Sequence, residues 1–147
     1  MTSGTGLGAV QSAFFSRLTG DSTVSSLVTG VFDAVPEGQP TPYIAIGDAT
    51  EIPNRTFGNN GHELTVTLHG YDQDGVAFKG QAARGFKRLL ALMNAVIISL
   101  ESMTSGVTGF ALVEVSYEFG QPIREEDSAG GVYRHMPARF RVVLEDA

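Results

Sequence analysis

The stretch Glu63-Leu-Thr-Val-Thr-Leu-His-Gly-Tyr71, with the apolar stripe that follows it, decides the fold. Leu64, Val66 and Leu68 alternate with polar residues, which is the pattern of a strand with one buried face. After a turn over residues 72–75, for which Asp74 is the expected helix cap, apolar residues recur at helical spacing. The stripe consists of Phe78, Ala82, Phe86, Leu89, Leu90, Met93, Val96 and Ile97. A half-buried strand followed by a long amphipathic helix predicts a sheet with a helix packed on it.

Two further alternating stretches lie toward the C-terminus and predict the remaining long strands. Residues 110–119 are expected to turn Ala111, Val113, Val115 and Tyr117 to the core. Residues 132–144 are expected to turn Ala138, Phe140, Val142 and Leu144 inward. Arg139 and Arg141 then point outward, opposite Glu114 and Glu118, so cross-strand ion pairs explain them without a further function.

The N-terminal third predicts helices first and short strands afterwards. Leu7, Val10, Phe14 and Leu18 recur at helical spacing up to Gly20, and Asp21 is a candidate cap for a short helix ending at Gly30. Short strands are expected at 31–35 and 43–46. The whole chain, 1–147, is therefore expected to form one α+β domain. Its antiparallel or mixed sheet of about five strands packs against one long helix and short N-terminal helices. Residues 1–8 are expected to be a flexible tail, and 48–61 and 120–131 are expected to be protruding polar loops.

Composition excludes several classes of function. The chain has 147 residues and a net charge of −6, which argues against a general nucleic-acid binder. It has no Cys, so disulfides, thiol nucleophiles and cysteine-ligated metals are excluded. His62 and His69 lie seven residues apart on one strand, so they face opposite sides and cannot share a metal. The apolar run at 89–100 is too short to span a bilayer. We expect no cofactor, no metal, no membrane contact and no enzymatic activity.

Two long loops without a catalytic set favour contact with other proteins. The candidate contact residues in the loops are Glu51, Arg55, Phe57, Asn59, Arg124, Glu125, Glu126 and Asp127. A second candidate is the set Arg84, Lys87 and Arg88 on the polar side of the long helix. These cations form either a solvated helix face or a contact with an acidic partner or with DNA phosphates.

The order of residues resembles a known family along most of the chain. The matching stretches begin with Ala9-Val-Gln-Ser-Ala-Phe-Phe-Ser-Arg-Leu-Thr-Gly-Asp21, Leu27-Val-Thr-Gly-Val-Phe-Asp33 and Pro42-Tyr-Ile-Ala-Ile-Gly47. They continue through the strand at 62–68, the helix at 82–92 and the ending Gly131-Val-Tyr-Arg134 to Phe140-Arg141. In this respect the chain is similar to the tail terminators of tailed phages, also called tail-completion or tail-to-head joining proteins.

The resemblance implies a structural virion protein that is assembled in the host cytoplasm and located in the tail or neck. Such proteins form a homo-hexameric ring that caps the head-proximal end of the tail tube and stops its polymerisation. The implied partners are other copies of the chain, the tail tube protein and a head connector or stopper protein. DNA passes through the lumen of the ring without specific binding.

Two rival interpretations stay open at the level of sequence. Another neck component, such as a head-completion or stopper protein, has a similar size and also forms rings. A small host enzyme or ligand-binding domain is the rival from a different class, because a sheet with a helix can carry many functions. That rival requires a pocket with convergent polar groups.

Overall fold

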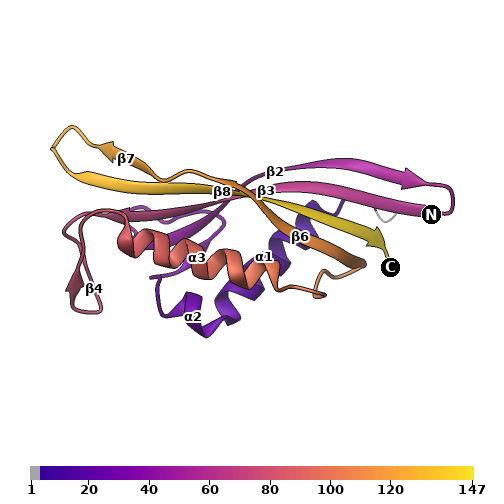
Figure 1. Cartoon of the computed structure of the whole chain (residues 1–147), viewed down its shortest axis with the longest axis horizontal. Coiled ribbons are helices and arrows are strands. Elements are labelled where there is room, and N and C mark those ends of the chain that lie inside the picture. Colours follow the sequence, from indigo (N-terminus) through magenta and orange to yellow (C-terminus); the bar gives the residue numbers. More distant parts are fainter. Residues whose placement is uncertain (1–3) are drawn as a thin grey trace.

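The computed structural model describes residues 4–147, and a six-stranded mixed sheet runs through its length with the helices on one face (Figure 1). The helices are α1 (Leu7–Gly20), α2 (Ser22–Ser25) and α3 (Lys87–Glu101). The strands are β1 (Val31–Phe32), β2 (Tyr43–Thr56), β3 (Asn59–Gln73), β4 (Ala77–Phe78), β5 (Gln81–Ala82), β6 (Phe110–Gly120), β7 (Ile123–Glu126) and β8 (Val132–Asp146). The order in the main sheet is β1-β2-β3-β8-β6, with β7 also paired to β8. Only β1 is parallel to its neighbour, so the expected α+β class with a mixed sheet is confirmed.

The core lies between the sheet and α1 and α3. In β3 and β8 the even-numbered residues face the helices, with Leu64 opposite Val142 and Val66 opposite Phe140. Phe14 of α1 meets the Phe140 ring edge-on, with 6.2 Å between the ring centroids. This packing fixes which residues of the sheet face away from the helices.

The long helix begins later than its apolar spacing predicted. Residues 77–82 form the small hairpin β4–β5, and α3 starts at Lys87. Gly75, Gly80 and Gly85 all have positive φ, near 80°, which breaks helical geometry at five-residue intervals. The prediction that Asp74 caps this helix is also wrong: its carboxylate bonds to the Gly85 N–H and to Arg134.

The segments predicted as loops are largely hairpins. Residues 48–61 belong to β2 and β3, which stay paired up to Thr56 and Asn59 around a Phe57–Gly58 turn. The strands extend past the helices, where both faces meet solvent, so the segment carries no apolar alternation. We call residues 50–63 the arm. In the second segment β7 pairs with β8, leaving a short turn at 127–131.

Three further expectations change in detail. Bulges between Leu112 and Glu114, and between Tyr117 and Phe119, shift β6, so Val115 faces the core while Val113 is 56% exposed. Asp21 does cap α2, but α2 ends at Ser25 and β1 at Phe32, both earlier than expected. Of the predicted tail, residues 1–3 lie outside the described residues. Leu7 and Gly8 belong to α1, and the Gly6 N–H donates to Glu51.

Candidate assembly surface

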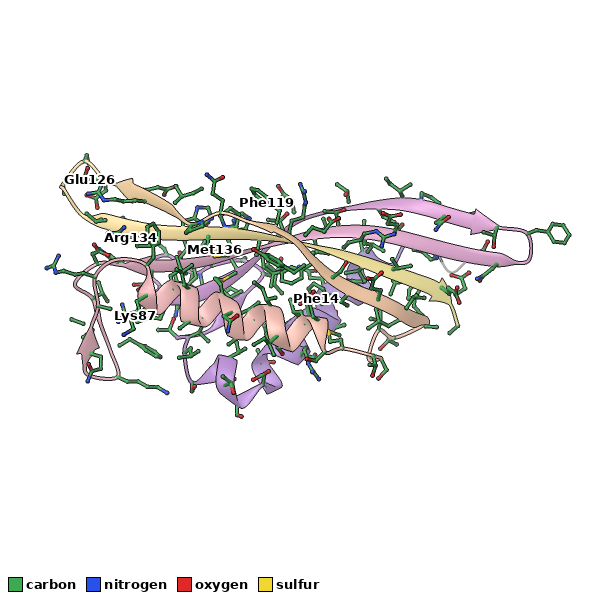
Figure 2. The ribbon with its side chains drawn as sticks, in the orientation of Figure 1. Phe14, Lys87, Phe119, Glu126, Arg134 and Met136 are labelled. Carbon is green, nitrogen blue, oxygen red and sulfur yellow. The ribbon has the colours of Figure 1, made fainter. Side chains whose placement is uncertain are left out.

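One face of the main sheet is uncovered within residues 4–147: α1 and α3 both lie on the other side (Figure 1). We call it the open face. Figure 2 shows this division, with Phe14 on the helix side and Phe119 on the opposite side. The open face carries the odd-numbered residues of β3 and β8, from Glu63 to Gln73 and from Tyr133 to Glu145. A sheet face of this size without a helix over it is a candidate contact surface.

A band of stacked rings crosses the open face away from the arm. Tyr43, Tyr71 and His135 stand side by side on β2, β3 and β8, with 5.1 Å and 4.4 Å between successive ring centroids. His69 joins them, because its Nδ1 lies 2.8 Å from His135 Nε2. Only one of these two nitrogens carries a proton and donates. Stacked aromatic rings that are half-exposed are typical of protein interfaces.

Burial in the ring band shifts the acid–base behaviour of its members. Burial, with the nearby His135, lowers the pKa of His69, so the neutral imidazole is favoured. Burial also raises the pKa of the Tyr43 and Tyr71 hydroxyls. Sequence analysis missed this band, because rings 26 and 64 residues apart along the chain meet only through strand pairing. The available signal was the outward position of His69 and Tyr71 on one strand.

Ion pairs occupy the part of the open face nearer the arm. Arg141 bonds to Glu63 at 2.8 Å and to Glu114 at 3.3 Å, and Arg139 lies 3.6 Å from Glu118. The predicted cross-strand pairs of Arg139 and Arg141 are therefore confirmed. The Arg141 guanidinium lowers the pKa of the Glu63 carboxyl.

The arm divides its four candidate residues into one anchor and three exposed groups. Glu51 points inward, where its carboxylate accepts the Gly6 N–H at 2.8 Å and lies 3.2 Å from the buried His62. Asp146 holds the other nitrogen of His62 at 2.8 Å. Arg55, Phe57 and Asn59 lie at the exposed end, and Phe57 is fully exposed in the turn. The arm therefore has a fixed base and a free apolar tip.

The β7–β8 hairpin lies at the opposite end of the molecule from the arm, and Figure 2 shows Glu126 near its tip. Arg124 pairs with Glu126 at 3.5 Å, and Glu125 lies 3.7 Å from His135. Asp127 accepts the backbone N–H groups of Ala129 and Gly131. Asp127 thus closes the turn, while the other three side chains remain accessible.

The three cations predicted on one helix face occupy three different settings. Arg84 precedes α3 and is exposed, and Lys87 is the first residue of α3 and is also exposed. Arg88 instead turns back to Asp72, whose carboxylate is 3% exposed, and bonds to both of its oxygens at 2.9 and 2.7 Å. The prediction of Arg88 as a partner-facing residue is wrong, because the buried Asp72 requires its charge.

The described residues use their other polar groups within the fold. The largest groove, about 680 Å³, lies at the ends of α1 and α3, and its lining includes Arg17 and Asp21. Arg17 donates to the Ser99 carbonyl and Asp21 caps α2. Residues 4–147 contain no group of three or more candidate metal ligands. No helix in that range has the length and apolar character required to cross a membrane.

Comparison with known proteins identifies the family. The family model of tail completion protein gp17 matches residues 12–145. The chain also resembles a solved structure described as the virion of a native gene transfer agent particle, with a TM-score of 0.79 and 23% identity. The match covers 97% of this chain and 99% of that chain, and at this identity it shows a shared fold. No curated protein sequence matches the chain. The chain therefore belongs to the tail completion protein gp17 family, and it is a structural protein of the virion tail.

Proposed function

We propose that the chain is a tail terminator. Six copies form a ring on the head-proximal end of the tail tube, stop polymerisation of the tube protein and join the tail to the head connector. DNA passes through the lumen of the ring without specific binding. The open face of the sheet, in a member of a tail completion family, is the observation that carries this proposal.

The shape of the chain supports a ring. A ring is built from heterologous contacts, in which one patch of a subunit meets a different patch of its neighbour. The arm and the β7–β8 hairpin project from opposite ends of an elongated sheet, so each copy offers two different ends (Figure 1). The open face between them carries stacked rings and ion pairs rather than a closed apolar core.

The proposed contacts use the candidate residues that remain accessible. Arg55, Phe57 and Asn59 at the tip of the arm meet the tail tube or a neighbouring copy. Arg124, Glu125 and Glu126 form a second contact at the β7–β8 hairpin. Phe57 is the anchor we expect to matter most, because a fully exposed aromatic side chain gains free energy when a partner buries it.

The test combines mass measurement with imaging. Light scattering across a concentration series should give six times 15.6 kDa, with ring-shaped particles and an open centre in negative stain. When the free protein is monomeric, the same measurements are made after addition of tail tubes, because some rings form only on a partner. Rings on tube ends support the proposal. Binding to the portal side of the neck, with bare tube ends, would assign the chain to the stopper class instead.

A further inference from the structure

A small hairpin with three exposed cations projects from the helix side of the sheet, at the end away from the arm (Figure 1). We call residues 76–87 the basic finger. Its cations are Lys79 at the turn, Arg84 after β5 and Lys87 at the start of α3, which Figure 2 labels. Within the described chain, none of the three forms an ion pair. The nearby carboxylates are already engaged, Asp72 by Arg88 and Asp74 by Arg134.

The basic finger is held in place rather than loosely attached. Arg88 donates to the carbonyls of Val76 and Gln81, at 2.9 Å each, while it also binds Asp72. The Gly75 N–H donates to the Ala83 carbonyl, and Asp74 accepts the Gly85 N–H. The cations are therefore presented on a fixed support, which reduces the conformational entropy lost on binding.

The conformation of Lys79 is a second sign of function. Lys79 has φ of 51° and Gly80 has φ of 79°, a pair of values that favours Asn or Gly at the first position. A lysine there costs free energy that the hairpin itself does not recover. Its side chain gains only a long contact, with Nζ 5.5 Å from the centroid of the Phe78 ring.

Charge at the opposite end of the molecule is complementary to the basic finger. The part of the sheet next to the arm has more carboxylates than cations. Its charged residues are Glu51, Glu63, Glu114, Glu145 and Asp146 against Arg55 and Arg141. Glu63, Glu114 and Glu145 lie on the open face, in adjacent rows of β3, β6 and β8, and share the single cation Arg141. We call these three residues the acidic end.

We propose that the basic finger of one copy docks on the acidic end of the next copy. This inference rests on the proposed ring and names the residues that orient its subunits. The two patches lie at opposite ends of one elongated chain, so their pairing joins copies head to tail, as a ring requires. Opposite charges attract across the contact, while the same patches repel when two like ends meet.

A second copy fits the basic finger better than DNA does. The chain as a whole carries −6, which repels phosphates. The cations also stand beside small or apolar exposed side chains, namely Ala77, Ala82 and Leu90, which is 42% exposed. This mixture of apolar and charged groups is typical of a protein interface rather than of a phosphate-binding surface.

The test is a charge exchange within one chain. R84E/K87E should raise the protein concentration needed for ring formation by about tenfold or more, because like charges then face each other. E114K/E145K should have the same effect. The combined variant R84E/K87E/E114K/E145K should return to near the wild-type concentration. The matched control R84K/K87R keeps both charges and should assemble like the wild type.

Each contrary result is distinct. Wild-type assembly by R84E/K87E would overturn the docking contact while leaving the ring intact. A failure of the combined variant to recover, in variants that all unfold at the wild-type urea concentration, would also overturn it. Salt-sensitive binding of DNA by the wild type that R84E/K87E abolishes, with normal ring formation, would assign the basic finger to DNA instead. If the wild type forms no ring alone or on tail tubes, the proposed function itself fails.

Discussion

Arg88 shows how one side chain links three segments of the chain. It neutralises the buried Asp72 on β3 and binds a carbonyl on each side of the β4–β5 hairpin. The hydrogen bonds to Asp72 also raise the pKa of Arg88 above its already high value. Arg88 therefore remains charged at every pH at which the protein is folded.

Replacing Arg88 with Ala should lower the free energy of unfolding by about 3 kcal/mol, since Asp72 is left buried without its partner. Urea unfolding monitored by circular dichroism measures this loss. The neighbouring change Lys87→Ala is the control, and it should stay within about 0.5 kcal/mol of the wild type. An Arg88→Ala variant as stable as Lys87→Ala would contradict the structural role of the ion pair.

His69 should make stability depend on pH. Its folded-state pKa is lowered from 6.5, so below that value the unfolded chain binds more protons than the folded chain. Stability should therefore fall as the pH drops from 7 to 5. His69→Gln should flatten this part of the profile, measured by urea unfolding at a series of pH values. An unchanged slope in the variant would show that His69 stays as protonated in the fold as in the unfolded chain.

At the scale of elements, α3 lies so close to β3 that a glycine is needed between them. A Cβ on Gly70 would lie 2.5 Å from Met93 Sδ and 3.0 Å from Leu89 Cδ1. Gly70→Ala should therefore cost about 1–3 kcal/mol, and adding Met93→Ala should recover part of that loss. Gly8→Ala is the matched control, because nothing lies within 4 Å of that site. It should stabilise α1 by up to about 1 kcal/mol. Strictly additive effects of Gly70→Ala and Met93→Ala would contradict the close contact.

The tip of the arm should be dispensable for folding and required for assembly. Replacing residues 55–60 with Asn-Gly keeps the Asn54–Gly61 pair and rebuilds a two-residue turn. The cost in stability should stay near 1 kcal/mol, because the chief loss is the Asn60–Asp146 hydrogen bond. Capping of tail tubes, scored in negative stain, should be lost. Normal capping by the shortened chain would remove the arm from the proposed contact.

The sequence predicted elements that have one buried face and missed those that have none. Leu64, Val66 and Leu68 alternate because they meet the helices, so this strand was found from its pattern. Residues 51–56 pair just as regularly but lie outside the core, where both faces are polar. Phe78, Ala82 and Phe86 fit a helical spacing by chance, and the glycines at positive φ decide against it.

The candidate residues divide along the same line. Arg55, Phe57, Lys87 and Arg124 are accessible as expected, because polar or isolated side chains in a short loop rarely find a core. The roles of Glu51 and Arg88 depend on His62 and Asp72, which belong to a different strand or helix. A single sequence does not reveal those pairings, nor the ring band formed by Tyr43, Tyr71 and His135.

At the scale of the whole molecule, the chain is an elongated sheet with a covered face, an open face and two dissimilar ends (Figure 1). A protein that ends a growing tube needs these properties, because it must match its neighbours in the ring while offering the tube no further site of addition. Membership of the tail completion family fits this arrangement.

The most direct measurement follows tube growth. Purified tail tube protein is allowed to polymerise with and without an excess of this chain, and tube lengths are read from negative-stain images. The account predicts that growth stops on addition of the chain and that a ring is seen on one end of each tube. Tubes that keep lengthening, with bare ends in the presence of folded protein, would contradict the assignment of this chain as a tail terminator.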